Sequence, residues 1–178
     1  MPVIPYQPKD LQDPAELVSA IRTRRGGQLL KLDRMLLHSP PFAAGWNDFL
    51  QAVRNNLSLD KRLAELAICM VAILNDANYE FEQHAPEFIK AGGTQRQLEA
   101  LQQLIEVDTV TSPLFSPVEQ AVLQLTNEMT RFVHVRETTM ERVMLLLDDT
   151  QQHVELVGVI STYNMVSRYL VALGVQAE

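Results

Sequence analysis

The sequence predicts an all-α protein, a single-domain multi-helix bundle of eight or nine helices. Apolar residues recur at helical spacing through most of the 178 residues, and no segment alternates with a period of two for long enough to form a strand. Prolines, paired glycines and helix-capping residues separate the periodic segments. Because 47% of the residues are hydrophobic, a chain of this length can bury a substantial core as one domain.

The N-terminal segment is expected to be an extended arm over residues 1–13. Four of the nine prolines fall within the first 14 residues. Proline fixes its own backbone angle and lacks the amide hydrogen that a helix interior needs. We therefore place the helical domain at residues 14–178.

Three helices are predicted ahead of the central segment, over about residues 14–24, 28–37 and 42–55. Gly26-Gly27 breaks the first from the second, and the second ends before Pro40, because a residue that precedes proline disfavours helical backbone. The third helix carries apolar side chains at helical spacing. We expect this stripe to lie in the core; it comprises Phe42, Trp46, Phe49, Leu50 and Val53.

The chain is organised around residues 58–93, where polar residues stand among apolar ones. Every residue from 63 to 74 is apolar or a thiol except Glu65, so this stretch predicts a buried helix, with Ser58 as its N-terminal cap. Burying an ionised carboxylate is costly unless it is paired, and desolvation alone would raise its pKa. Glu65 is therefore a candidate functional residue.

A second helix of this central segment is predicted over about residues 77–91. It carries Glu80 and His84 four residues apart, and hence on one helix face. Because the break between the two helices is short, they must pack antiparallel, and Glu65 could then meet Glu80 and His84. Histidine exchanges protons near neutral pH, and a carboxylate can orient its ring. The three side chains suit proton abstraction and return on a small carboxylated or carbonyl substrate.

Capping patterns mark four further helices. They are expected to begin at Thr94, Ser116, Thr138 and Asp149 and to end near residues 105, 133, 147 and 173. Ser116 is followed by Pro117, which is favoured at the first helical position. A linker is expected over residues 107–115.

Composition limits the partners and the location of the protein. The formal net charge of −7 argues against a nucleic-acid partner, because phosphate groups require a basic surface. The N-terminal residues lack the apolar stretch of a signal peptide, and the apolar run over residues 63–74 is too short to cross a membrane. We expect a cytoplasmic protein that binds a small-molecule substrate and neither nucleic acid nor membrane.

The segment RLAELAICMVAILNDANYEFEQHAPEFIKAGG, residues 62–93, resembles the carboxymuconolactone decarboxylase family, which shares its fold with the alkylhydroperoxidase D-like proteins. LLHSPPFAAGW upstream and ELVGVISTYNMVSRYL downstream are also similar to segments of that family. The resemblance therefore extends from about residue 24 to residue 173. It implies an all-helical, alkylhydroperoxidase D-like fold and a homo-oligomer, commonly a trimer or a hexamer.

The site that the resemblance implies departs from the peroxidase branch of the family. That branch uses a glutamate, a Cys-x-x-Cys pair and a histidine four residues after the second cysteine. Glu65 and His84 match the outer positions, but Ala77 and Glu80 stand where the cysteines would be. The single cysteine, Cys69, lies on the preceding helix and replaces neither. The resemblance thus implies the decarboxylase branch, a carbon–carbon lyase, with Glu65, Glu80 and His84 as acid–base residues and no cofactor.

Alternatives stay open for both the site and the function. Glu80 and His84 could be an ordinary helical pair on an exposed face. They could also bind a metal with Glu65 as a third ligand, although no second such pair occurs and the resemblance implies no metal. An acid–base enzyme that resembles a lactone decarboxylase stands beside an alkylhydroperoxidase D-like or peroxiredoxin-like family member with weak or lost thiol peroxidase activity, which would act as an oligomeric binding or stress-related protein.

Overall fold

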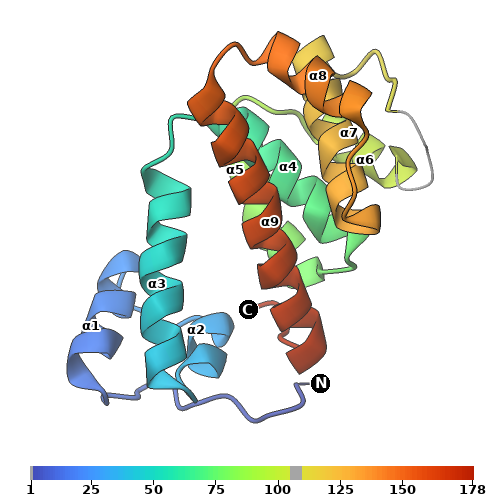
Figure 1. Ribbon diagram of the computed structural model, residues 1–178. Coiled ribbons are helices and arrows are strands. Elements are labelled where there is room, and N and C mark those ends of the chain that lie inside the picture. Colours follow the sequence, from blue (N-terminus) through green and yellow to red (C-terminus); the bar gives the residue numbers. More distant parts are fainter. Residues whose placement is uncertain (1, 105–109) are drawn as a thin grey trace. The chain divides into compact units, whose positions relative to one another are not determined.

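The computed structural model describes residues 2–104 and 110–178 and is all-helical over these residues (Figure 1). The described part contains nine α-helices and one 3₁₀ helix, and no strand occurs in it. The fold class predicted from the sequence is therefore confirmed. The chain divides into two compact units, one over residues 2–56 and 170–178 and the other over the described residues of 57–169.

The first unit contains three helices, α1 (Ala15–Arg24), α2 (Lys31–Leu36) and α3 (Pro40–Asn55). Helix α3 packs against both α1 and α2. Asp33, which is almost completely buried, accepts a hydrogen bond from the amide of Leu30 at 3.1 Å and so caps α2. It also pairs with Arg24 at 3.3 Å and with Arg25 at 3.2 Å.

The structure corrects two predictions in this unit. Helix α2 begins at Lys31 instead of residue 28, and α3 begins at Pro40, because proline is well tolerated in the first turn of a helix. The predicted aromatic stripe is only partly in the core. Trp46 is buried, but Phe42 and Phe49 are 47% and 49% exposed.

The second unit is built around α4 (Lys61–Leu74), which packs most extensively against α5 (Asn78–Lys90) and α7 (Pro117–Phe132). The other elements of this unit are α6 (Gln95–Leu101), a 3₁₀ helix (Gln102–Leu104), α8 (Glu137–Leu146) and the part of α9 (Thr150–Leu173) up to residue 169. Apolar side chains of α4, α5, α6 and α7 form one core cluster, which includes Leu66, Met70, Phe88, Leu98, Leu101 and Leu123.

Three of the helix caps predicted from the sequence occur in the structure after residue 93, and one does not. Thr94 and Ser116 form the predicted capping boxes, and Asp149 accepts from the amide of Gln151 at 2.7 Å at the start of α9. The box predicted at Thr138 is wrong, because α8 begins one residue earlier without a side-chain cap. The predicted end near residue 105 and residues 107–109 of the predicted linker lie outside the described residues, and residues 110–115 form no helix.

The N-terminal cap of α4 is Asp60 and not Ser58. Asp60 accepts hydrogen bonds from the amides of Arg62 and Leu63 at 2.9 and 3.1 Å. Ser58 is instead held by Glu155 of α9, whose Oε2 accepts from the Ser58 amide at 2.8 Å and from the Leu59 amide at 2.7 Å. Two carboxylates therefore satisfy the polar backbone at the entry to α4.

Helix α9 is the one helix of the described residues that is long and apolar enough to cross a membrane, with a mean hydropathy of 1.3 over its most apolar window. Half of that window is buried inside the molecule. Core helices of soluble proteins share these properties. The cytoplasmic location stays a prediction.

Candidate active site

Helices α4 and α5 form a hairpin that holds the candidate site. In the turn between them, Asp76 has a φ of 54°, a left-handed conformation that aspartate tolerates better than most residues do. The amide of Ala77 donates to the carbonyl of Ala72 at 2.8 Å. The chain reverses over residues 75–77, so α5 returns along α4.

Glu65 on α4 and His84 on α5 are in direct contact. Nδ1 of His84 lies 2.6 Å from Oε2 of Glu65. The other carboxylate oxygen, Oε1, lies 2.8 Å from Nζ of Lys61, one turn earlier on α4. Glu65 and His84 are 1% and 8% exposed. The structure thus brings Glu65 and His84 together as the hairpin geometry predicts, while their catalytic role stays a prediction.

The partners of Glu65 determine its protonation state. Burial by itself raises the pKa of Glu65, but the hydrogen bonds and positive charges of His84 and Lys61 outweigh burial and hold the pKa below its ordinary value. Desolvation alone would raise this pKa, but the two partners compensate the buried charge, so the net direction is downward. Glu65 is an ionised carboxylate at neutral pH.

An ionised Glu65 fixes the state of the imidazole. A carboxylate can only accept hydrogen bonds, so Nδ1 of His84 is the donor and carries a proton. The ring also meets the ring of Tyr163 edge to face, with centroids 4.8 Å apart and an interplanar angle of 84°. Glu65 and Tyr163 together hold the imidazole in one orientation, with Nε2 as its second ring nitrogen.

Glu80 lies in the first turn of α5 and is 2% exposed. Its position is reflected in the environment of Cys69 on α4. Burial raises the pKa of the Cys69 thiol, and the negative charges of Glu65 and Glu80 raise it further. Both carboxylates therefore act on the same thiol, and this environment opposes a reactive thiolate. Because Glu80 and His84 are both buried, the interpretation that they form an ordinary exposed pair is wrong.

Two neighbours of the pair were not predicted as site residues. Lys61 stands four residues before Glu65, and opposite charges at that spacing are a sequence signal for a helical ion pair. Tyr163 gives no such signal, because it lies 79 positions after His84 (163 − 84) within an apolar helix. Only the packing of α9 brings its ring to the imidazole.

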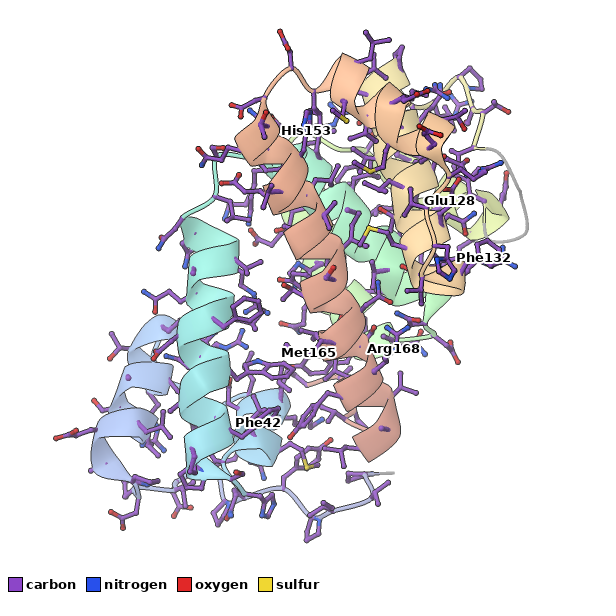
Figure 2. All side chains as sticks on the ribbon, viewed as in Figure 1. Phe42, Glu128, Phe132, His153, Met165 and Arg168 are labelled. Atoms are coloured by element: carbon purple, nitrogen blue, oxygen red, sulfur yellow. The ribbon has the colours of Figure 1, made fainter. Side chains whose placement is uncertain are left out.

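The polar residues of α9 hold the second unit together. Asn75, at the end of α4, donates to Oδ1 of Asn164 at 3.0 Å and to Oγ of Ser167 at 2.7 Å. Asn164 donates in turn to Oγ1 of Thr130 on α7 at 2.9 Å. Arg168, labelled in Figure 2, donates to the carbonyl oxygen of Asn164 at 2.9 Å. These contacts join α4, α7 and α9.

Another buried carboxylate, Glu128 on α7, borders a cleft of about 350 Å³ that Phe132 also lines. Oε1 of Glu128 accepts from Nε of Arg136, from Oγ1 of Thr139 and from Nε2 of Gln124, each at 2.8 Å. Oε2 accepts from the Arg136 amide at 2.8 Å. Burial raises the pKa of Glu128, but the hydrogen bonds of Arg136, Gln124 and Thr139 outweigh it and lower the pKa.

In the part of the chain that the structure describes, no group of three or more His, Cys, Asp and Glu side chains is arranged to hold a metal ion. The metal alternative considered for Glu65, Glu80 and His84 needs such a set. The described contacts of Glu65 are instead with a lysine and a histidine.

The sequence profile of the carboxymuconolactone decarboxylase family matches residues 40–128, half of the chain, and this stretch includes Glu65, Glu80 and His84. No curated protein matches the sequence. Several solved structures share the fold.

A peroxidase-related protein from Silicibacter sp. TM1040 matches with a TM-score of 0.78 and 16% identity, over 96% of this chain and 88% of that one. A protein of unknown function from Agrobacterium tumefaciens, provisionally named as the antioxidant defence protein AhpD, gives a TM-score of 0.71 and 18% identity over 81% of this chain and 95% of that one. A cysteine-to-alanine variant of the debrominase Bmp8 in complex with 2,3,4-tribromopyrrole gives a TM-score of 0.80 and 13% identity, over 100% of this chain and 94% of that one. At these identities the likeness establishes an AhpD-like fold.

Proposed function

Since the chain belongs to the carboxymuconolactone decarboxylase family, we propose that it performs acid–base chemistry, a decarboxylation or a proton transfer, on a small carboxylated or lactone substrate. The observation that carries this proposal is the buried contact of 2.6 Å between the Glu65 carboxylate and Nδ1 of His84. A histidine whose Nδ1 is held by a carboxylate can give or take a proton at Nε2. Glu80, four residues before His84, is proposed as the third acid–base group.

In a decarboxylation, the bond between a substrate carbon and its carboxylate carbon breaks, and carbon dioxide leaves. The electron pair of that bond stays on the substrate carbon, where an adjacent unsaturated carbonyl group delocalises it. A proton from Nε2 of His84 then forms the new carbon–hydrogen bond. The negative charge of Glu65 stabilises the ring while it carries that proton.

The competing interpretation, a binding protein that has lost thiol peroxidase activity, requires no proton-transfer site. A surface position for His84 would favour it. The burial of His84 and its contact with a buried carboxylate favour the enzyme instead.

The test is the decarboxylation of carboxymuconolactone, measured as carbon dioxide release by wild type and by His84→Ala. We expect the variant to lose about a hundredfold or more in kcat, the usual contribution of a positioned proton donor, with its fold intact by circular dichroism. His38→Ala is the matched control, since His38 bonds the N-terminal segment through Pro5 and Gln7. Equal turnover by wild type and His84→Ala would contradict the proposal.

We also propose a homo-oligomer, a trimer or a hexamer. Phe42 and Phe49 on α3 and Leu145 on α8 are large apolar side chains with exposed fractions of 47%, 49% and 81%, and such side chains favour burial against another copy. Light scattering at micromolar concentration measures the mass, and a monomer would contradict this part of the proposal.

A further inference from the structure

We propose that Lys61 is a positioning residue for the Glu65–His84 pair: it holds one oxygen of the carboxylate so that the other faces the imidazole. This inference rests on the proposed acid–base function of the pair. The geometry divides the two oxygens of Glu65 between two partners, with Oε1 at 2.8 Å from Nζ of Lys61 and Oε2 at 2.6 Å from Nδ1 of His84.

The two contacts together fix the carboxylate plane. With His84 alone, the carboxylate could exchange its oxygens or turn about its terminal torsion, which is broad for glutamate. A lysine one turn earlier on the same helix face holds that torsion in place, because residues four apart on a helix are neighbours. The orientation of the carboxylate then determines the tilt of the imidazole and the direction of Nε2.

Lys61 differs from Glu65 and His84 in how far its side chain is exposed to solvent. The side chain of Lys61 is 53% exposed, whereas those of Glu65 and His84 are 2% and 10% exposed. A half-exposed ion pair adds little to folding stability, because solvent screens it. Its effect on the buried end of the carboxylate is larger, because that end is shielded from water. Lys61 therefore affects the site more than it affects the fold.

Among the described contacts of Glu65, Lys61 supplies a positive charge whether or not His84 is protonated. Cys69 on α4, Glu80 on α5 and the phenol of Tyr163 on α9 supply no positive charge. On the neighbouring α7, Glu119 pairs with Arg62 at 2.8 Å and Glu128 pairs with Arg136. The positive charge of Lys61 contributes to the lowered pKa of Glu65, so its removal should move the titration of Glu65 to higher pH.

The experiment compares Lys61→Met, which keeps the length of the side chain, with Lys61→Arg, which keeps the charge. Lys90→Met is the matched control, because Lys90 forms an exposed pair with Glu87 at 3.7 Å on α5. Nitrogen NMR of the histidine rings reports the tautomer of His84, and carbon NMR of the glutamate carboxyls follows the titration of Glu65. Neither measurement needs a substrate.

For Lys61→Met we expect the Glu65 titration to move to higher pH and the His84 ring to populate both tautomers. In turnover of carboxymuconolactone, kcat should fall by about tenfold to a hundredfold, the range for a misplaced catalytic group, with KM unchanged and the acid limb of the pH profile moved upward. Lys61→Arg should restore most of the rate and the original acid limb. A purely structural lysine would not move that limb.

An unchanged titration and tautomer in Lys61→Met, or the same changes in Lys90→Met, would overturn the inference. The NMR arm also separates the two proposals. If the titration and the tautomer respond to Lys61 but wild type does not turn over the probe, Lys61 positions the pair and the proposed function fails.

Discussion

Glu65 and Glu128 are buried carboxylates on the packed helices α4 and α7, and the two differ in the kind of partner that surrounds them. Glu128 is enclosed by the guanidinium and backbone amide of Arg136, a threonine hydroxyl and a glutamine amide. None of these donors changes its charge at ordinary pH. Glu65 shares its oxygens between an exposed lysine and a buried histidine, a side chain that can accept and donate a proton.

The comparison shows that burial and a lowered pKa do not by themselves mark an active site. Both carboxylates have both properties. Glu128 joins the end of α7 to the start of α8 and stabilises that junction, since it binds Arg136 and Thr139. The distinguishing feature of Glu65 is a partner that can transfer a proton.

The largest expected effect comes from the same change at both positions, measured in turnover. Glu65→Gln keeps the shape but removes the charge that orients and stabilises the histidine, so kcat for carboxymuconolactone should fall by about a hundredfold. Glu128→Gln should leave kcat within about twofold, since the hydrogen bonds of Glu128 are with Gln124, Arg136 and Thr139. Similar losses in both variants would mean that the two glutamates do not differ in role.

In folding stability the order of the two variants should be reversed, with the larger loss in Glu128→Gln. Glu128→Gln weakens hydrogen bonds from a cation and a backbone amide, and the free energy of unfolding should fall by about 1.5–3 kcal/mol. Glu65→Gln retains a hydrogen bond to His84 and should lose about 1 kcal/mol. Urea unfolding measures both at a constant m value. Glu87→Gln, at an exposed pair, should stay within about 0.5 kcal/mol of wild type.

Acid should reduce the stabilisation that each of the two ionised carboxylates contributes to the fold. A glutamate whose pKa is lowered in the folded state stabilises the fold above its unfolded pKa, and this stabilisation is lost as the pH falls through the folded pKa. Unfolding curves should therefore show stability that decreases below about pH 4.3, the ordinary pKa of glutamate. Each Glu→Gln variant should lower the slope by at most about 1.4 kcal/mol per pH unit. An unchanged slope in both variants would contradict the pKa directions.

The smallest expected effect is at Cys69, which is fully buried and influenced by the charges of Glu65 and Glu80. Because this environment opposes a thiolate, peroxide turnover with a dithiol reductant should stay at background in wild type and in Cys69→Ala. Turnover by wild type that disappears in Cys69→Ala would show that the site performs thiol chemistry.

Much of the fold was predictable because its signals are local. The helices, the hairpin of α4 and α5 and the contact of Glu65 with His84 follow from apolar periodicity and from the spacing of three polar residues. Lys61 was also within reach, since it stands four residues before Glu65.

Long-range packing set the limits. The ring of Tyr163 contacts His84 from a helix far along the chain. Glu155 accepts a hydrogen bond from the amide of Ser58, and Asp60 instead of Ser58 caps α4. The net pKa direction of Glu65 could not be predicted for the same kind of reason. Desolvation can be inferred from an apolar neighbourhood, whereas the compensating partners depend on where two side chains end in space.

The hydrogen bonds of Glu155 to the backbone at the start of α4 also provide a spectroscopic reporter. The amides of Ser58 and Leu59 are held by a carboxylate that lies 97 and 96 positions away in the sequence. Their exchange with deuterated solvent requires that the Glu155 carboxylate release them, and not merely that α4 fray. Exchange rates at these two amides, set against those of Arg62 and Leu63 beneath their local Asp60 cap, would therefore measure how often this long-range contact between α9 and the entry to α4 opens.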